Sequence, residues 1–139
     1  MRGVLSCYLH DMILLSLVMK MIGIDIVEVD RMETLFRRYG NRFLRRVFAD
    51  NEVHYVRSIK RDRLVAKYLA KQFAVKEAYI KAVGGMYNNL SMRSISTTHD
   101  KLGKPFLVIN GVMQKHISIS ISDERCYAVA LVLINGQNT

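Results

Sequence analysis

Proline, tryptophan and cysteine are scarce in this chain. Its 139 residues include one proline, two cysteines and no tryptophan. Cys7 and Cys126 are too few for a disulfide scaffold, and no CxxC motif or Cys/His cluster suggests a zinc site. The sequence therefore indicates a protein of a reducing compartment, and we expect it to be cytoplasmic.

Long apolar runs are also missing. The longest one outside the core pattern, Met12–Met19, is shorter than the roughly 20 residues that cross a bilayer. Lys20 then stands where a signal peptide needs a small-residue cleavage site. We interpret residues 1–20 as a dispensable leader that arises from the choice of start site, with Met21 as the true start. The alternative is a genuine amphipathic tail.

Acidic residues are few relative to basic ones. The chain has 21 Lys and Arg against 12 Asp and Glu, a net charge of +9, and residues 31–81 alone hold 14 basic and 5 acidic side chains. With 50% hydrophobic residues, the chain can bury the core of one domain. An acidic partner should therefore meet the first half of this domain, and the candidates are nucleic acid, a phosphate-rich cofactor, an acidic protein or an anionic membrane.

From residue 21 the pattern of apolar side chains predicts a strand followed by helices. Residues 21–27 alternate with a period of two, which is typical of a strand. Residues 29–39 have helical spacing and Gly40-Asn41 is a stop signal. Asp50 can cap a helix that runs towards Ile59.

The longest helix is predicted over residues 62–83 and ends at Gly84-Gly85. Four short segments follow it, separated by turn residues, and each is rich in β-branched residues or alternates between apolar and polar side chains. This order predicts an α+β fold with helices packed on a mostly antiparallel sheet, in a single domain over residues 21–139. The predicted strands are Leu90–Thr98, Phe106–Ile109, His116–Ser122 and Tyr127–Ile134. The side chains expected in the core from the two long helices are Met32, Leu35, Phe36, Tyr39, Leu64, Val65, Tyr68, Leu69, Phe73 and Ile80.

Two carboxylates are candidates for chemistry. Asp25 lies within an otherwise apolar strand, where a carboxylate is costly unless it binds something. Its alternative role is to cap a neighbouring turn at the strand end. Glu77 is flanked by small residues on the long helix, and its alternative role is a surface ion pair with Lys81 at i+4. Taken singly, these residues identify no function.

Four segments in one order do indicate a function by resemblance. They are Gly23-Ile-Asp-Ile-Val-Glu28, then Phe73-Ala-Val-Lys-Glu-Ala78 with Lys81-Ala82, then Gly103-Lys-Pro105, then a serine-rich strand before Tyr127-Ala-Val-Ala130. Over essentially all of residues 21–135 the chain resembles the holo-[acyl-carrier-protein] synthases, which are small bacterial 4′-phosphopantetheinyl transferases. The resemblance implies their fold and the transfer of 4′-phosphopantetheine from coenzyme A to a serine of apo acyl carrier protein. Adenosine 3′,5′-bisphosphate would be released, and the reaction would serve fatty acid biosynthesis.

The resemblance also implies the site. Mg²⁺ would be held by Asp25 and Glu77, and the protein would be a homotrimer with its active sites at subunit interfaces. Glu77, or a metal-bound water that it polarises, would accept the serine proton. Lys81 would hold the coenzyme A phosphates as a point charge, which makes Asp25, Glu77 and Lys81 the catalytic candidates. Further candidates for coenzyme A contacts are Lys76, Gly84, Gly85, Lys104, Pro105 and Ser118.

The basic first half has a matching role. Acyl carrier proteins are strongly acidic, and in the family the corresponding helix docks the carrier protein. The residues predicted to dock it are Arg31, Leu35, Arg38, Arg42 and Arg46. The alternative is a solvated surface.

Three departures from the family pattern bear on individual residues. Gln72 stands where many relatives have Arg, and the connection after Pro105 is short. The family's strand histidine aligns with Ser118, although His116 lies two residues away on the same face.

A competing reading is a basic nucleic-acid-binding module without transferase activity. A third is a weakened transferase that binds coenzyme A but transfers slowly. No recognised nucleic-acid motif is present, so we expect neither nucleic acid nor membrane as a partner.

Overall fold

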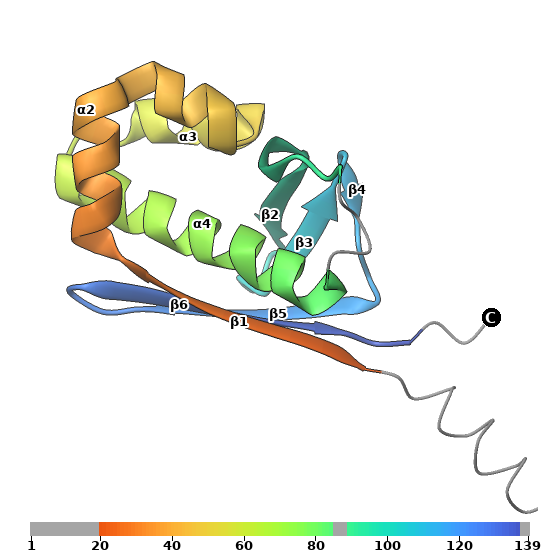
Figure 1. Ribbon diagram of the computed structural model, residues 1–139. Helices are drawn as coiled ribbons and strands as arrows, with labels where there is room; N and C mark the ends of the chain where they lie inside the picture. The colour runs from red at the N-terminus through yellow and green to blue at the C-terminus, as the bar shows by residue number, and fades with distance from the viewer. Residues whose placement is uncertain (1–19, 85–88, 137–139) are drawn as a thin grey trace, which may run out of the picture.

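The first and last strands of the domain lie side by side. The computed structural model describes residues 20–84 and 89–136, so the predicted leader before Lys20 and the candidate Gly85 lie outside the described residues. The helices are α2 (Val29–Val47), α3 (Asp50–Ser58) and α4 (Asp62–Val83), with a 3₁₀ turn η1 (Met92–Ser94). The strands are β1 (Met21–Glu28), β2 (Ile95–His99), β3 (Pro105–Ile109), β4 (Val112–Met113), β5 (Ile117–Asp123) and β6 (Tyr127–Ile134). Figure 1 shows their arrangement.

These strands form two antiparallel sheets. In the larger sheet the order is β1-β6-β5, with Met21 opposite Ile134, and in the smaller it is β2-β3-β4. Helix α4 lies along one face of the larger sheet, α2 packs against α4, and α3 lies on the side of α4 that faces away from this sheet (Figure 1). The α+β architecture with helices on an antiparallel sheet is confirmed.

Small residues bring α4 unusually close to β1. A Cβ atom on Gly23 would lie 1.9 Å from the backbone oxygen of Ala78 and 2.7 Å from the backbone nitrogen of Ala82. No side chain fits there, so the strand and helix backbones are in direct contact. This contact fixes how the residues that follow Gly23 in β1 face α4.

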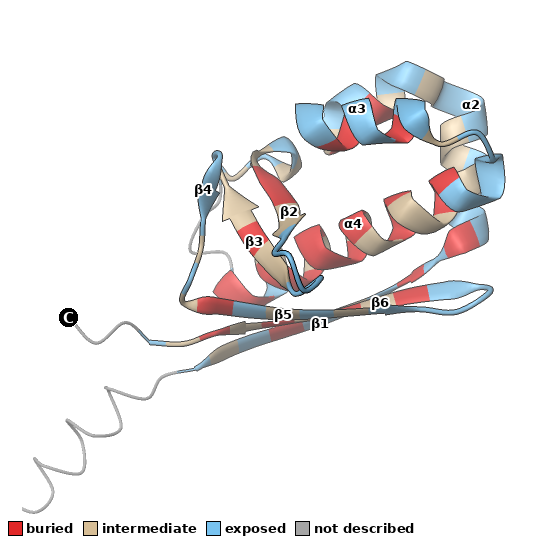
Figure 2. Ribbon diagram, turned by 180° about the vertical axis from the view of Figure 1, so that it is seen from behind, coloured by how far each residue is buried: buried red, intermediate tan, exposed pale blue. Residues whose placement is uncertain are grey.

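Burial alternates from residue to residue along the strands β1 and β6 of the larger sheet (Figure 2). The inner face carries buried side chains such as Val27 and Val132 against α4. On the outer face Ile22, Ile24 and Ile26 are 63%, 58% and 65% exposed. The alternation predicted for residues 21–27 is therefore confirmed, and its isoleucine face lies outside the core of this chain.

The helix predicted over residues 29–39 is interrupted at Gly40, as the stop signal predicts, but helical structure resumes directly after it. Gly40 adopts φ 49° and ψ −129°, which kinks the chain, but the helix resumes and reaches Val47. Apolar side chains beyond the kink explain why, since Leu44 is 2% exposed in the core. Two expected core residues are exposed instead, Tyr39 by 44% and Leu64 by 50%.

The start of α3 also differs from the prediction. Asp50 is its first residue rather than its cap, and the backbone N–H of Ala49 donates to Oε2 of Glu52 at 2.7 Å. A glutamate three residues into a helix can satisfy the free amide at the helix start. In the second half, the segment predicted as a strand from Leu90 begins as η1, and the short strand β4 was not predicted.

Candidate functional site

Asp25 forms an ion pair with the C-terminal half of α4. Nζ of Lys81 lies 2.6 Å from Oδ1 of Asp25 and 3.2 Å from the backbone oxygen of Ile24. The Asp25 side chain is 15% exposed and that of Lys81 is 54% exposed. Asp25 therefore stands within β1, opposite Ala130, and its partner is a helix cation rather than a turn.

Glu77 lies one turn before Lys81 on the same side of α4. Residues four apart on a helix share a face, and Glu77 is partly exposed there. The alternative surface pair of Glu77 with Lys81 does not describe the structure, since Lys81 pairs with Asp25. We call Asp25, Glu77 and Lys81 the seam cluster, because Lys81 pairs with Asp25 across β1 and α4 and Glu77 shares a helix face with Lys81.

The seam cluster fits a magnesium ion that is completed by a substrate. Mg²⁺ prefers oxygen ligands and is usually bound through one or two carboxylates together with substrate phosphates and water. Residues 20–84 and 89–136 contain no group of three or more His, Cys, Asp or Glu side chains arranged to hold a metal. Two carboxylates on adjoining elements match the open kind of site and not a closed protein cage.

Gly84 ends the helix that carries the seam cluster. It adopts φ 56° and ψ 45°, and its N–H donates to the backbone oxygen of Ile80 at 3.1 Å. This left-handed conformation favours glycine and turns the chain away just after Lys81.

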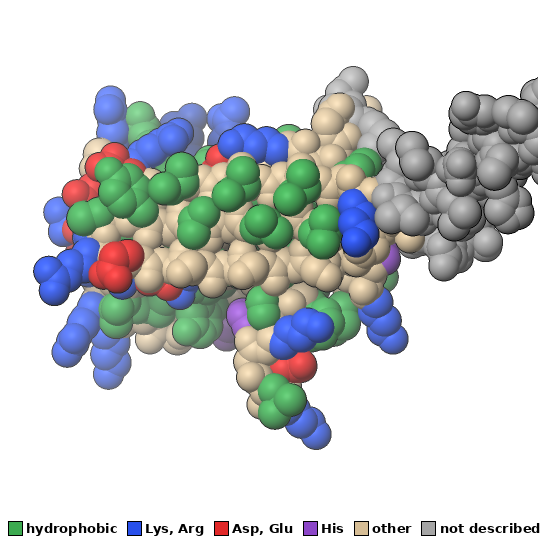
Figure 3. Space-filling model, turned by 90° about the horizontal axis from the view of Figure 1, so that it is seen from below, with side chains coloured by type: hydrophobic (Ala, Val, Ile, Leu, Met, Phe, Trp, Pro, Cys, Tyr) green, Lys and Arg blue, Asp and Glu red, His purple; other side chains and the backbone are tan. Residues whose placement is uncertain are grey.

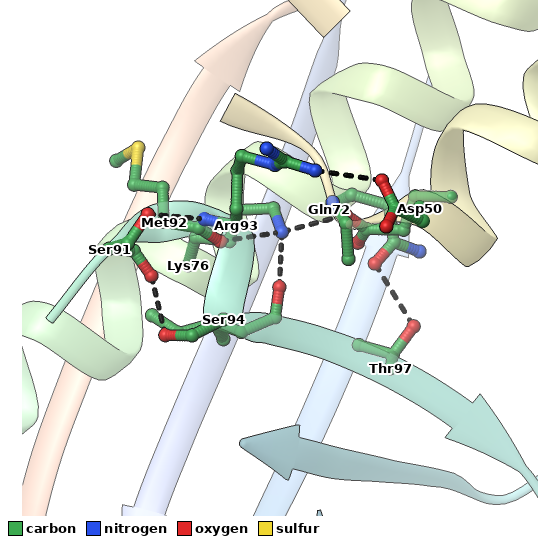
Figure 4. A network of polar contacts seen from close by, with 11 residues as sticks. Asp50, Gln72, Lys76, Ser91, Met92, Arg93, Ser94 and Thr97 are labelled. Atoms are coloured by element: carbon green, nitrogen blue, oxygen red, sulfur yellow. Dashed lines mark hydrogen bonds and ion pairs between the residues drawn. The ribbon is translucent and has the colours of Figure 1, made fainter. Parts of the chain in front are cut away.

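Lys76 does not join the seam cluster, contrary to its prediction as a coenzyme A ligand. Its side chain is 1% exposed, and Nζ lies 2.7 Å from Oε2 of Glu52, which is equally buried. Nζ also donates to the backbone oxygens of Met92, at 3.0 Å, and Ile95 (Figure 4). The reason is helix geometry, because successive side chains turn by about 100° and Glu77 faces the seam.

The Lys76–Glu52 pair is a buried ionic link that the sequence analysis missed. Burial raises the pKa of Glu52 although Lys76 opposes the rise, and burial lowers the pKa of Lys76 although Glu52 opposes the fall. Nζ of Lys76 also lies 5.5 Å from the ring centroid of Phe48. The link joins α3, α4 and the start of β2.

A pocket of about 560 Å³ lies on another side of α4. Gly103 and Pro105 of the predicted coenzyme A segment line it together with Gln72. The hydroxyl of Thr97 donates to Oε1 of Gln72 at 3.0 Å (Figure 4). Nζ of Lys104, which neighbours both lining residues, lies 5.3 Å from the Phe106 ring centroid.

The cavity and the seam cluster are at opposite edges of the larger sheet. Asp25 belongs to the edge strand β1, whereas Asp123, which lines the cavity, belongs to the other edge strand β5. Gln72 and Lys81 are nine residues apart on α4, which is about two and a half turns and places them on opposite sides of the helix. The single chain therefore separates the predicted coenzyme A residues into two groups.

The serine and histidine candidates lie with the second group. Ser118 is exposed in β5, and His116, which is partly buried, precedes that strand. The backbone oxygen of His116 accepts from the N–H of Asn135 at 3.0 Å. Both residues follow the β5 edge and not the β1 edge where Asp25 lies.

The predicted docking residues follow α2. Arg31, Arg38, Arg42 and Arg46 are exposed, and Leu35 is partly buried. The Arg31 guanidinium lies 5.9 Å from the ring centroid of Phe73, and that of Arg38 lies 5.2 Å from that of Tyr39. Lys and Arg side chains gather at the end of the molecule where α2 lies, at the left of Figure 3.

Within residues 20–84 and 89–136, no helix is long and apolar enough to cross a bilayer.

Comparisons with known proteins agree on one family. The sequence profile of the 4′-phosphopantetheinyl transferase superfamily matches residues 21–132. The holo-[acyl-carrier-protein] synthase of Anaplasma marginale (strain St. Maries) is 43% identical over 115 residues, covering 82% of this chain and 96% of the relative. That of Ehrlichia chaffeensis is 40% identical over 115 residues, covering 81% and 94%.

Solved structures give the same result. A holo-(acyl-carrier-protein) synthase from Bacillus anthracis in complex with CoA (3′,5′-ADP) has a TM-score of 0.70 and 33% identity, covering 84% of this chain and 96% of that one. The Neisseria meningitidis synthase has a TM-score of 0.71 and 33% identity, covering 83% and 97%. The Helicobacter pylori synthase in complex with coenzyme A has a TM-score of 0.67 and 28% identity, covering 83% and 100%.

Proposed function

Because the chain belongs to the 4′-phosphopantetheinyl transferase superfamily, we propose that it is a magnesium-dependent holo-[acyl-carrier-protein] synthase. It moves 4′-phosphopantetheine from coenzyme A to a serine of apo acyl carrier protein and releases adenosine 3′,5′-bisphosphate. The observation that carries this proposal is the seam cluster, in which Asp25 and Glu77 lie within the two motifs of the matched region.

The reaction requires that the negative charge of a pyrophosphate be stabilised. A serine hydroxyl attacks the phosphorus atom, and the bond to the leaving phosphate breaks as negative charge builds on it. Bound Mg²⁺ would neutralise part of this charge and orient the pyrophosphate for in-line attack. Asp25 and Glu77 would hold the ion.

The remaining steps use this chain's own side chains. Glu77, on the partly exposed side of α4, accepts the proton that the serine hydroxyl loses, either directly or through a water. Lys81 is held beside Asp25 and presents a mobile ammonium group to the coenzyme A phosphates. Gly84, which has no side chain, lets the cofactor approach the backbone.

A homotrimer would unite the two groups of site residues. The outer face of the larger sheet presents Ile22, Ile24 and Ile26 beside Leu131 and Leu133 of β6, and Figure 3 shows this apolar face. Contiguous apolar surface of this kind is rare on monomers and marks interaction sites. A ring of copies brings one edge of a subunit to a different edge of the next, so the seam cluster of one copy can meet the cavity of its neighbour.

Carrier-protein docking on α2 and a cytoplasmic location belong to the same proposal. Exposed arginines along α2 offer an acidic carrier protein an electrostatic approach. The exposed thiol of Cys126 suits a reducing compartment.

Mass spectrometry tests the proposal directly. Apo acyl carrier protein is incubated with coenzyme A, Mg²⁺ and this protein, with omission of Mg²⁺ as the control. We expect the serine of the carrier to gain the mass of one phosphopantetheine group only when Mg²⁺ is present. No mass shift, together with salt-sensitive binding to arbitrary DNA, would instead favour the nucleic-acid-binding alternative.

A further inference from the structure

A second pocket, of about 490 Å³, opens between the end of α2, the helix α3 and the turn η1. We call it the basic pocket, and its lining residues are Arg45, Asp50, Val53, His54, Arg57 and Arg93. The three arginines come from three different elements, so the fold assembles them and no single run of the sequence does. None of the six belongs to the seam cluster or to the docking residues predicted along α2.

One acidic side chain partly neutralises the basic pocket. Nη2 of Arg93 lies 2.7 Å from Oδ1 of Asp50, whose side chain is 91% exposed. Exposed ion pairs of this kind contribute little stability, so an incoming anion can compete with Asp50 for the guanidinium group. Among the described residues the structure gives Arg45 and Arg57 no ion pair, and they leave the pocket with a positive surplus.

The walls of the basic pocket are anchored to the core. Val53, on its floor, is 6% exposed, and the neighbouring Glu52 holds Lys76 of α4. Lys76 also donates to the backbone oxygen of Met92, next to Arg93 (Figure 4). The backbones that carry these arginines are therefore fixed before a partner arrives, which reduces the ordering cost of binding.

The chemistry favours a carboxylate on a protein surface. A guanidinium group binds a carboxylate through two parallel hydrogen bonds. The charged lining residues are all exposed, so a small anion bound there would remain hydrated and screened by salt. A protein that covers the rim excludes water and presents several carboxylates at once.

We propose that the basic pocket receives an acidic side chain of a protein partner and extends the docking surface from α2 onto α3 and η1. The partner is the acyl carrier protein, so this inference rests on the proposed function. Arg45 lies in the last turn of α2, three residues after the docking candidate Arg42, and residues three apart share a helix face, so the pocket adjoins the basic face of α2.

Charge reversal within the pocket tests the inference. The double variant Arg45→Glu/Arg57→Glu is compared with Lys20→Glu/Lys115→Glu, which changes the net charge equally. The control residues are exposed and lie just before β1 and β5, whose first residues Met21 and Ile117 both stand opposite Ile134 of β6. Circular dichroism and size-exclusion chromatography verify that both variants fold and assemble as the wild type does.

We expect the pocket variant to raise KM for the carrier about tenfold or more, with KM for coenzyme A and kcat within about twofold of wild type. Its kcat/KM for the carrier should also depend less on NaCl, because fewer charges attract the partner. A carrier with one acidic residue changed to Lys should bind the pocket variant better than it binds the wild type. Equal behaviour of the two double variants, or a rise confined to KM for coenzyme A, would overturn the inference.

Direct binding separates this inference from the proposed function. Fluorescence anisotropy of labelled apo carrier protein is measured with each protein in the absence of coenzyme A. If the wild type transfers no phosphopantetheine to the carrier, the proposed function fails. The docking site is still supported in that case if the wild type and the control variant bind the carrier protein and the pocket variant does not. Absence of carrier binding to the wild type overturns the docking site itself.

Discussion

At the residue scale, the two carboxylates of the seam cluster have different surroundings. Asp25 is held by Lys81 within the strand, while Glu77 is partly exposed one turn before Lys81 on α4. We expect Asp25→Asn and Glu77→Gln each to lower kcat by roughly 10²-fold or more, the scale of losing a proton acceptor or a charge-stabilising group. Steady-state kinetics over a Mg²⁺ titration measures this.

Both replacements are nearly isosteric, so the fold should persist, and circular dichroism provides that control. Wild-type activity with unchanged Mg²⁺ dependence in either variant would show that its carboxylate has only a structural role.

A second residue-scale prediction concerns Asp123. Nζ atoms of Lys67 and Lys71 lie 3.1 and 3.2 Å from its two oxygens. Partial burial acts to raise the pKa of Asp123, but hydrogen bonds from the two lysines outweigh it and the pKa is lowered. A carboxylate whose pKa is lower when folded stabilises the protein above its unfolded pKa, near 4, and loses that contribution as pH falls through the folded pKa.

We therefore expect Asp123→Asn to flatten the loss of stability between about pH 5 and pH 3 relative to wild type. Urea denaturation at each pH measures this, with Asp100→Asn on the β2–β3 turn as a carboxylate control. An unchanged pH profile in Asp123→Asn would contradict the assigned role of the lysines.

At the element scale, the buried Lys76–Glu52 pair holds α4 against α3 and η1. Removing one partner leaves an uncompensated charge in the core, which typically costs about 3–5 kcal/mol. We expect Lys76→Met to lower the free energy of unfolding by that amount, and Glu52→Gln/Lys76→Met to recover much of it. Urea denaturation measures both, and equal stability of the single and double variants would argue against a coupled pair.

Sequence patterns predict the bounds of some helices and strands better than those of others. Helix α4 and strand β6 begin and end where periodicity and turn residues placed them, because long apolar patterns and Gly84 leave few alternatives. The break predicted at Gly40 is a kink and not the end of the helical segment, because apolar residues beyond it, such as Leu44, are buried in a second helical stretch. The local sequence also does not predict which way the Lys76 side chain points. Only the packing of α4 against α3 decides that Lys76 faces Glu52 and not the seam cluster.

At the scale of the whole molecule, the candidate site is only partly contained in one chain. Motif order predicts that Asp25, Glu77 and Lys81 act together, and in the structure Lys81 pairs with Asp25. Lys104, Pro105 and Ser118 follow the opposite edge, and no single-chain pattern could specify how copies combine. The sequence therefore predicted the seam cluster but not the relation of the two groups.

Assembly through the isoleucine face gives the next prediction. Ile24→Lys places a charge at the centre of the exposed apolar face. We therefore expect the variant to form smaller assemblies than the wild type and to lose transfer activity by about tenfold or more. Light scattering coupled to size-exclusion chromatography measures the assembly. Leu64→Lys, an exposed apolar residue on α4, is the control. Wild-type assembly in Ile24→Lys would contradict an interface on this face.

A further prediction concerns residues 1–20, which precede the matched region. The family profile begins at residue 21, where β1 begins. We expect deletion of residues 1–20 to leave stability and transfer activity within about twofold, since termini that are not tied down contribute little to a fold. Thermal denaturation and the mass-spectrometric assay measure this, and an insoluble or inactive truncation would make the segment part of the fold.

The pairing of β1 with β6 has a consequence for biosynthesis. Met21 lies opposite Ile134, so the first strand finds its partner only after almost all of the described chain has been synthesised. Long-range strand pairing of this kind slows folding and leaves apolar edges exposed meanwhile. The ribosome thus releases a chain whose helices can form early, while the strand that carries Asp25 pairs with its neighbouring strand only at the end of synthesis.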